Sequence, residues 1–431
     1  MKITNWAKTR TYFPENIYYP KNERDICQAI KRTYESGRKL KVIGSGLSFS
    51  NAPAIEQDVM ILKDMNKVLS ISPEEKKITV QGGANIRTIN IELSKQQLAF
   101  KNFGSIVMQT AAGYTGTATH GSGIHTQILS ADISEIKLVD GTGNLHVVNR
   151  SQNPELFAHA RVHLGVLGVI TEITFECTRA FDIEEELKII DFDTALASLD
   201  DYLKNNEYCK IWWLPHTNKI QLYTYNTTTL PRTRKSLKSW LETTGISTVG
   251  FTSFIYLSRV FPKITPIMNQ TIQKTYFLPH INRNQSDALF NISKMIPIHD
   301  EMEYAVPIEK ATKAIEDIRS MIIHNRHYIN FPMEIRFVAS DDIPLSPSYN
   351  RNICYIGAYS SMPQKNVSYF KDFEDILKSY QARPHWGKNF YLSNLDFQRL
   401  YPKFQEFNNL RNTLDPNYIF FNKFSQQVFG T

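Results

Sequence analysis

The sequence predicts an α+β protein with two domains, and three observations support this fold class. The chain has 431 residues, which is enough for two or three domains. Short apolar segments typical of strands alternate with helical patterns along the whole chain. Fourteen of the 19 Gly lie between Gly37 and Gly168, whereas fourteen of the 19 Pro follow residue 180. We therefore expect a glycine-rich ligand-binding domain and a second domain that begins near residue 180.

In the first part, each expected element has its own local signal. Asn22 can cap a helix that ends before Gly37, and Gly44 follows a short apolar strand. The segment 140–144, Asp-Gly-Thr-Gly-Asn, is typical of a hairpin turn between two strands. The expected strands are 41–43, 59–62, 78–80, 133–139, 145–148 and 168–175, and a second helix is expected at 86–98.

In the second part, the same patterns predict a sheet with helices on one face. The expected strands are 184–190, 209–214, 220–225, 301–306, 333–338 and 353–359. The expected helices are 194–205, 308–323 and 367–380.

Composition and charge exclude several classes of protein. With 42% hydrophobic and 21% charged residues, the chain has a globular composition rather than a disordered or fibrous one. Its four Cys are far apart and form no CxxC motif, which argues against a disulfide scaffold and a cysteine zinc site and fits a reducing compartment. No signal peptide and no transmembrane segment are visible, so we expect a cytoplasmic protein, with peripheral membrane contact left open.

The net charge of +7 fits ordinary solubility, and an anionic partner is the alternative. The densest basic cluster is Arg232, Arg234, Lys235 and Lys238. It has no interleaved aromatic residues, so we interpret it as a solvated helix face and expect no nucleic-acid partner.

The first motif is Gly44-Ser-Gly-Leu-Ser-Phe49, which follows a strand. The dinucleotide fingerprint G-x-G-x-x-G fails at Phe49, and the nucleophile elbow G-x-S-x-G fails after Ser48. A loop that presents successive backbone N–H groups to a pyrophosphate remains, with a plain turn as the alternative.

The second motif is the segment 103–123, in which five glycines accompany many hydroxyl side chains. Its strand and helix propensities are both poor. Small residues at this density let a planar or phosphorylated ligand lie against the backbone, and a structural loop is the alternative.

Further candidates carry ionisable groups. His159 with His163 and His324 with His327 have helical spacing, but neither pair has a third ligand nearby, so we expect no metal site. In the strand 333–338, Glu334 and Arg336 share one face, either as a structural ion pair or in a polar pocket. The turn 383–388, Arg-Pro-His-Trp-Gly-Lys, presents His, Trp and Lys together.

Taken together, these segments resemble the sugar-1,4-lactone oxidase and alditol oxidase group of the vanillyl-alcohol-oxidase-type flavoproteins, which includes gulonolactone, galactonolactone and arabinonolactone oxidoreductases. The matching segments are Asn5-Trp-Ala7, Gly44–Phe49, Ala118-Thr-His-Gly-Ser-Gly123, residues 164–171, Glu301–Pro307, Glu334-Ile-Arg336, His385-Trp-Gly-Lys388 as the HWxK motif, and Leu414-Asp-Pro416.

The resemblance implies FAD as cofactor and a discontinuous architecture. Residues 1–178 and 386–431 would form a PCMH-type FAD-binding domain, and residues 179–385 a substrate-binding cap domain. The residues that it implies for cofactor binding are Ile43, Gly44, Ser45, Gly46, Leu47, Ser48, Phe49, Gly104, Ser105, Gly113, Thr117, Ala118, Thr119, His120, Gly121, Gly123, Gly168, Ile170, His385 and Lys388.

The resemblance also implies the chemistry. A carbinol, at C2 of an aldono-1,4-lactone or C1 of an alditol, would be oxidised by hydride transfer to flavin N5. Arg336 would polarise the substrate oxygen, Glu334 would bind a substrate hydroxyl, Lys388 would face flavin N1 and O2, and Ser105 would offer a hydroxyl.

Two positions, compared with the family pattern, carry expectations. Leu47 replaces the histidine that binds flavin covalently in many members, so we expect non-covalent FAD. Gly104 is typical of members that react with dioxygen, so we expect dioxygen to be reduced to hydrogen peroxide, with a dehydrogenase that uses another acceptor as the alternative. A decaprenylphosphoryl-ribose oxidase type and a flavin-binding protein without turnover are the remaining alternatives.

Overall fold

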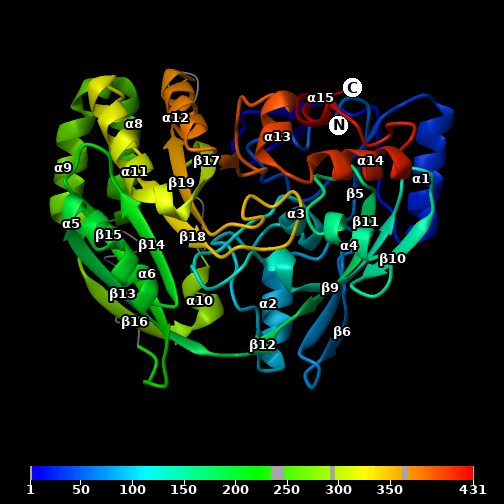
Figure 1. The fold of residues 1–431 in the computed structure, drawn as a ribbon, viewed down its shortest axis with the longest axis horizontal. Helices are drawn as coiled ribbons and strands as arrows, with labels where there is room; N and C mark the ends of the chain where they lie inside the picture. Colours follow the sequence, from blue (N-terminus) through cyan, green and yellow to red (C-terminus); the bar gives the residue numbers. More distant parts are fainter. Residues whose placement is uncertain (1, 234–246, 292–296, 362–366, 431) are drawn as a thin grey trace.

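The chain folds around two separate systems of β-sheet, which lie side by side (Figure 1). The structure is a computed structural model that describes residues 2–233, 247–291, 297–361 and 367–430. Strands and helices mix in both halves, which confirms the predicted α+β class.

The first system of sheets contains a three-stranded parallel sheet of order β3-β5-β4 and a five-stranded antiparallel sheet of order β10-β9-β11-β7-β6. Two small pairs, β1 with β2 and β8 with β12, accompany them. Their bounds are β1 Ile3–Thr4, β2 Thr11–Tyr12, β3 Asn16–Tyr18, β4 Leu40–Ile43, β5 Asp58–Ile61, β6 Val68–Ser72, β7 Lys77–Gln81, β8 Leu98–Ala99, β9 Ile133–Val139, β10 Leu145–Asn149, β11 Val169–Glu176 and β12 Thr178–Arg179.

The second system is one eight-stranded antiparallel sheet of order β16-β13-β15-β14-β18-β19-β17-β20. Its strands are β13 Asp182–Asp191, β14 Tyr208–Trp213, β15 Lys219–Thr227, β16 His280–Gln285, β17 Asp300–Pro307, β18 Met333–Val338, β19 Ile353–Ser360 and β20 Arg383–Pro384. On its helix-covered face, Met302, Ile335 and Phe337 are buried with residues of the covering helices.

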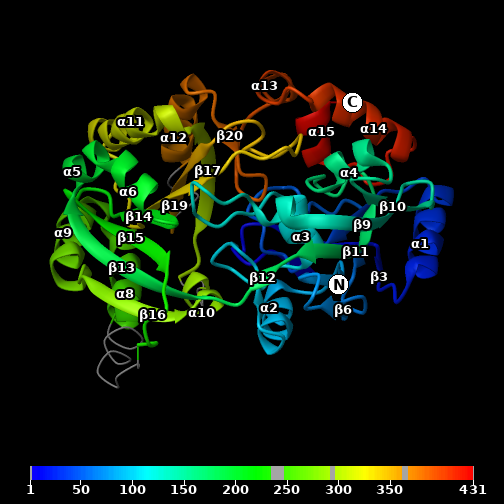
Figure 2. The same ribbon diagram turned by 60° about the horizontal axis from the view of Figure 1, so that its bottom comes forward.

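Helices cover that face and the outside of the first sheets (Figure 2). Those on the large sheet are α5 Phe192–Ala197, α6 Leu199–Asn205, α11 Ala311–His324 and α12 Val367–Ser379. The others are α1 Glu23–Glu35, α2 Ile86–Lys95, α3 Ala111–Gly116, α4 Pro154–Ala160, α8 Ser247–Val260, α9 Thr265–Tyr276, α10 Ser286–Phe290, α13 Asn394–Leu400, α14 Phe404–Leu414 and α15 Lys423–Phe429, with 3-10 turns η1 Leu129–Asp132, η3 Pro262–Ile264 and η4 Ile308–Lys310.

The C-terminal segment returns to the first sheets. Helices α14 and α15 lie on the side of α4 (Figure 2), and α13 packs against both of them. The backbone N–H of Leu40 donates to the carbonyl of Ile419 at 2.8 Å, and both residues belong to a buried cluster with Ile26 and Val139. Residues that are far apart in sequence therefore share this core.

Most predicted elements are present, and two predictions were wrong. The helix expected at 194–205 is divided into α5 and α6 at Ser198, a residue type whose hydroxyl competes with helical hydrogen bonds. The segment 103–123, for which helix propensity is poor, contains α3. The hydroxyl of Thr110 caps α3 by accepting from the N–H of Gly113 at 3.3 Å.

The basic cluster can be described only in part. Arg232 forms an ion pair with Asp182 at 2.8 Å, whereas Arg234, Lys235 and Lys238 lie outside the described residues. No helix within the described ranges is long enough and apolar enough to cross a membrane.

The two histidine pairs have ordinary surroundings. His159 and His163 are buried beside the first sheets, and burial lowers their pKa to about 4 and about 3. The positive charge of Lys41 adds to the effect on His163. His324 is exposed, and His327 contacts Asp372 at 2.7 Å.

We predict that His163 makes the fold sensitive to acid. In the unfolded chain the pKa of His163 is about 6.5, so the unfolded state binds a proton below that pH. The folded state binds this proton only near pH 3. The free energy of unfolding should therefore fall as pH decreases through this window, by up to about 1.4 kcal/mol per pH unit for this group. We would measure the free energy of unfolding of His163→Gln by urea titration between pH 7 and 5. Its slope against pH should be smaller than that of the parent by the equivalent of one proton, and His324→Gln is the control. An unchanged slope for His163→Gln would contradict the assignment.

Candidate active site

One cavity of about 640 Å³ lies between the two sheet systems. Its walls come from the loop 44–49, the loop 104–120, one face of the large sheet, and the turn that carries His385 and Lys388. The volume falls in the range typical of cofactor and substrate sites. The cavity therefore gathers residues of the four segments that the sequence singled out: 44–49, 103–123, 333–338 and 383–388.

Four adjacent strands direct polar side chains toward this cavity. The strand register aligns one residue from each strand in a row across the sheet. In order, these residues are Trp212 of β14, Glu334 of β18, Gly357 of β19 and Glu303 of β17. Cross-strand partners share one face of a sheet. At Gly357 a Cβ would lie 2.9 Å from the ring of Tyr359, so this glycine leaves room for a crowded row.

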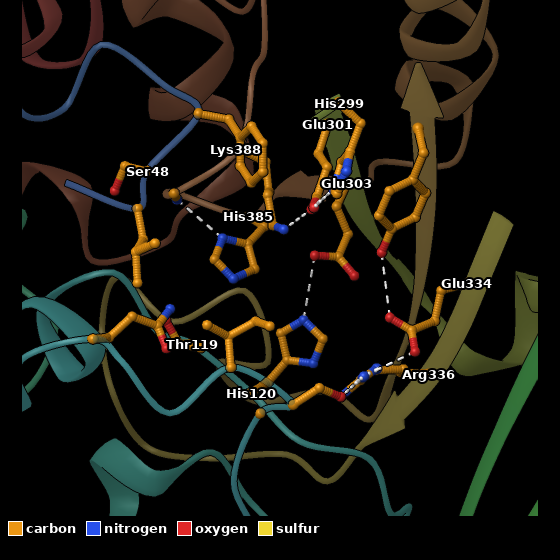
Figure 3. A pocket seen from close by; sticks show the side chains of 18 of the residues that line it. Ser48, Thr119, His120, His299, Glu301, Glu303, Glu334, Arg336, His385 and Lys388 are labelled. Atoms are coloured by element: carbon orange, nitrogen blue, oxygen red, sulfur yellow. Dashed lines mark hydrogen bonds and ion pairs between the residues drawn. The ribbon is translucent and has the colours of Figure 1, made fainter. Parts of the chain in front are cut away.

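The central feature of the row is the ion pair between Arg336, which is buried, and Glu334, whose side chain is 14% exposed (Figure 3). Arg336 Nη2 donates to Glu334 Oε1 at 2.8 Å and to the hydroxyl of Ser105 at 2.5 Å. Trp212 Nε1 donates to Glu334 Oε1 at 2.8 Å, and the Tyr359 hydroxyl donates to Oε2 at 3.2 Å. Burial alone would raise the pKa of Glu334, but the charge of Arg336, followed by that of Lys210, lowers it to about 2. Glu334 is therefore a carboxylate across the physiological range.

Lys210 is a second cation beside this pair that sequence reasoning missed. It stands opposite Arg336 in the sheet, and its Nζ lies over the rings of Trp212, Tyr223 and Tyr225 at 5.0, 4.5 and 5.6 Å. Burial lowers the pKa of Lys210, and the negative charge of Glu334 opposes that effect. The aromatic faces stabilise an ammonium group that has left water.

A second cluster joins the two sheet systems at His120, Glu303 and His385. The ring of His120 stacks on Tyr355 of β19 at 3.6 Å, and its Nε2 lies 3.5 Å from Glu303 Oε2. Burial would raise the pKa of Glu303, but the neighbouring His120 holds it below its usual value. Burial lowers the pKa of His385 to about 4, and its Nδ1 accepts the N–H of Gly387 at 2.9 Å, so its own proton is on Nε2.

These three side chains are also the one group, within the described ranges, whose ligand atoms lie close enough to share a metal ion, at no more than 4.8 Å from one another. The histidine pairs considered in the sequence are not part of it. Within the group, His120 Nε2 lies 3.5 Å from Glu303, and His385 Nδ1 accepts the N–H of Gly387.

Lys388 belongs to a third set of contacts at the same wall. Its Nζ forms an ion pair with Glu301, and Glu301 Oε1 contacts His299 Nε2 at 2.7 Å. Lys388 also lies over the ring of Phe49 at 4.8 Å. The turn 385–388 is thereby fixed to both β17 and the loop 44–49.

The loops of the cavity fit a dinucleotide cofactor. Gly46 has a φ of +70°, and a Cβ there would meet nothing within 4 Å, so the loop presents bare backbone to open space. Gln109 Oε1 and Arg336 Nε, both in residues that line the cavity, are buried without a hydrogen-bond partner. Unpaired buried polar atoms at a cavity wall fit a polar ligand, because they are costly when left unpaired. FAD satisfies these requirements.

Gly104 has a steric role that the sequence did not reveal. Its N–H bonds to the hydroxyl of Tyr114, and a Cβ would lie 2.8 Å from the carbonyl oxygen of His120 and 3.3 Å from Cγ2 of Thr119. A methyl group here would therefore push against the backbone of the neighbouring loop. The protein's own contacts therefore favour a glycine at this position.

Most of the residues proposed for cofactor binding line the cavity, and six do not. Ser105, Glu334, Arg336 and Lys388, the four proposed catalytic residues, all line it. The six that lie outside its lining are Ile43, Ala118, Gly121, Gly123, Gly168 and Ile170. At Gly121 a Cβ would lie 1.9 Å from Asn102 Oδ1, and at Gly168 one would lie 2.4 Å from the carbonyl oxygen of Val139. These glycines shape the loops rather than the cavity wall.

Sequence reasoning missed several residues of the site, chiefly Lys210, Trp212, His299, Glu301, Glu303 and Tyr359. Alternation along β14 and β17 was a signal for four of them, because Lys210 with Trp212 and Glu301 with Glu303 each share a face. Which strands are neighbours is not encoded locally, so the row across the sheet could not be predicted.

Comparisons with known proteins agree with this site. The family model "D-arabinono-1,4-lactone oxidase" matches residues 173–428, and the model "FAD binding domain" matches residues 14–149. The chain is 30% identical to L-gulonolactone oxidase of Scyliorhinus torazame, covering 99% of this chain and 98% of that one. It is 28% identical to L-gulono-1,4-lactone dehydrogenase of Mycobacterium tuberculosis, covering 99% of each.

Solved structures show the same fold. A crystal structure of cholesterol oxidase from Brevibacterium sterolicum superposes with a TM-score of 0.83 at 14% identity, over 99% of this chain and 96% of that chain. The fold, the cavity and the FAD-binding match define a two-domain FAD-dependent oxidoreductase of the vanillyl-alcohol oxidase type. Within that class, the chain belongs to the D-arabinono-1,4-lactone oxidase family, as the resemblance predicted.

Proposed function

We propose that this protein oxidises the C2 carbinol of an aldono-1,4-lactone with FAD as the immediate acceptor. The observation that carries the proposal is the Glu334–Arg336 pair at the cavity, with Arg336 also bonded to Ser105 of the opposite wall. Relatives named as lactone oxidases and a lactone dehydrogenase support a lactone rather than an alditol oxidised at C1. The 2-keto product of such an oxidation tautomerises to an ene-diol.

In this mechanism the protein binds, orients and deprotonates the substrate. FAD, when bound, supplies the hydride acceptor at its N5 atom. Arg336 holds the hydroxyl oxygen of the carbinol and stabilises the negative charge that develops on it. Glu334 keeps Arg336 in place and accepts a hydrogen bond from a neighbouring substrate hydroxyl.

The hydroxyl proton needs an acceptor, and we assign Glu303 to this role. Arg336 stays protonated, and Glu334, whose pKa is lowered to about 2 by Arg336 and Lys210, is too weak a base for this step. Glu303 lines the same cavity and is ionised beside His120. Its carboxylate is the remaining base of this row of the sheet.

We assign FAD to the loops 44–49 and 104–120 together with His385 and Lys388. In the same proposal, residues 1–178 and 386–431 form the FAD-binding domain and residues 179–385 the substrate domain. The bond between Leu40 and Ile419 supports joining the tail to the first domain. Anaerobic mixing of the holoenzyme with aldonolactones and alditols tests the function, because a substrate bleaches the flavin absorbance and a non-substrate does not.

We predict that Arg336→Ala slows flavin reduction by the lactone by about 10²-fold or more, since it removes the charge that stabilises the developing alkoxide. Arg336→Lys keeps a charge but not the two-point contact with Glu334 and Ser105, and should recover only part of the rate. Stopped-flow absorbance measures both. A parent-like rate in Arg336→Ala, with FAD bound, would leave the residue a purely structural role.

We predict that Glu303→Gln lowers the rate of flavin reduction by about 10²-fold, because an amide cannot accept the proton. The parent rate should fall at low pH as Glu303 protonates, and the variant should lose that limb of the profile. Glu303→Asp, which retains a carboxylate, is the matched control. If Glu303→Gln keeps both the rate and the pH profile, another base acts.

We predict that FAD is bound without a covalent link, because Leu47 at the cavity wall has no nucleophilic atom. Acid precipitation should release all of the yellow colour into the supernatant. Flavin retained by the denatured pellet would contradict the prediction, and a peptide digest would then locate the attachment.

We propose dioxygen as the final acceptor and predict one hydrogen peroxide per lactone oxidised under air. The support is Gly104, although its contacts show that an alanine there would also move the loop of His120. The decisive measurement is therefore made on the parent enzyme: its photoreduced flavin should reoxidise within seconds in air-saturated buffer. Reduced flavin that persists for minutes would indicate a dehydrogenase. Gly104→Ala should slow reoxidation, with FAD affinity measured in parallel to account for the loop.

A further inference from the structure

The hairpin formed by α8, η3 and α9 carries an exposed apolar surface, which we call the apolar tip. It consists of Tyr256, Leu257, Val260, Phe261 and Ile267, whose exposed fractions are 56, 47, 67, 57 and 70%. The five residues surround the turn between two helices that lie side by side at the edge of the molecule (Figures 1 and 2). Large apolar side chains gathered on one exposed turn are typical of a binding surface.

Polar contacts on the inner side of the hairpin fix this orientation. On α8, the buried residue Ser258 accepts a hydrogen bond from Asn330 Nδ2 at 2.6 Å. On α9, the buried residue Asn269 donates to the carbonyls of Pro215 and Ile329, each at 2.8 Å. Rotating either helix to hide its apolar side chains would break buried hydrogen bonds. The hairpin is therefore held with its apolar residues outward.

The charge carried by the hairpin segment itself has one sign. From residue 247 to residue 285 the sequence contains no Asp and no Glu. Arg259 and Lys263 flank the tip, and Lys274 is exposed farther along α9. The acidic residues of the neighbouring strand β13 are engaged elsewhere, since Glu184 pairs with Arg283 and Glu185 with His280. An exposed aromatic and aliphatic tip in an acid-free basic segment is complementary to an anionic, apolar partner.

We propose that the apolar tip docks this protein on the surface of an anionic lipid bilayer. The Phe and aliphatic side chains would enter the boundary between headgroups and acyl chains, and the exposed Lys263 would contact the lipid phosphates. Arg259 donates to the carbonyl of Ile298 at 3.2 Å and lies over the ring of Tyr256, and so adds positive charge at the tip. A second copy of this chain fits the surface less well, because an identical basic tip would repel it. An anionic lipid surface can cover the apolar side chains and attract the positive charges of the hairpin.

Docking in this way would place the catalytic cavity beside the bilayer. Thr252 of α8, Ile272 of α9 and Phe277, which follows α9, line the cavity from the inner side of the same hairpin. One element thus presents an apolar face outward and a cavity wall inward. The proposal does not depend on the substrate and stands whether or not the lactone assignment is correct.

Flotation of the full-length holoenzyme with vesicles tests the proposal. Vesicles of phosphatidylcholine mixed with phosphatidylglycerol should bind the parent protein, and pure phosphatidylcholine vesicles should bind it more weakly. Phe261→Ser should lower the binding by at least about fivefold. Lys263→Gln should lower binding to the anionic vesicles alone by about fivefold, and added salt should do the same.

The matched control is Leu395→Ser, which removes a leucine that is 62% exposed on α13, away from the hairpin. It should bind vesicles like the parent. Phe261→Ser should keep its FAD content and thermal stability, which separates lost docking from misfolding. Absence of parent binding to anionic vesicles, or equal binding by Phe261→Ser, would overturn the proposal. Light scattering that shows a dimer abolished by Phe261→Ser would overturn it in favour of a second copy.

Discussion

The largely buried ion pair between Glu334 and Arg336 is the interaction around which the site is organised. Two charges out of water are tolerated only when their hydrogen-bonding atoms find partners, and losing one member of such a pair costs about 3–5 kcal/mol. Trp212 and Tyr359 donate to Glu334, and Ser105 accepts from Arg336 Nη2 at the opposite wall, which leaves Arg336 Nε for a ligand. The pair therefore requires both neighbouring strands and the glycine-rich loop to be in place. Its ionisation, and hence its chemistry, depends on the completed fold.

The large sheet makes this arrangement possible because its two faces have different environments. Residues of odd number on β18, Ile335 and Phe337, enter the core beneath the helices, whereas Glu334 and Arg336 meet the cavity. A shift of the register by one residue would bury the charges against the helices and expose the core residues. The hydrophobic pattern of β18 thus selects the register that also aligns Lys210 with Arg336 and Trp212 with Glu334.

Local sequence predicted the elements well and the site in part. Strand β18 was predicted with its bounds, and Glu334 and Arg336 were placed on one face, because alternation is a local property. The capping of α3 by Thr110 was missed, since a single hydroxyl outweighed poor propensity over a short segment. Glu303 was missed because its importance arises from strand order: β17 reaches the cavity through β19, and His120 arrives from another sheet system. Such contacts between distant segments have no local signature.

The glycines of the cavity loops also show that local sequence does not reveal the contacts of a residue in the fold. From sequence, Gly104 and Gly121 could be explained by ligand contact, but their missing Cβ atoms would collide with His120 and Asn102 of the protein itself. The loop 102–123 must pack tightly because it bonds to the large sheet through Gly123 N and the Phe337 carbonyl at 2.6 Å, while it also forms a cavity wall. A chain that serves both purposes has no space for side chains on its packed side. Gly104 and Gly121 are therefore required first by close packing within the loop. Gly123 is required by the contact between the two sheet systems, since a Cβ there would lie 2.9 Å from the carbonyl oxygen of Glu207.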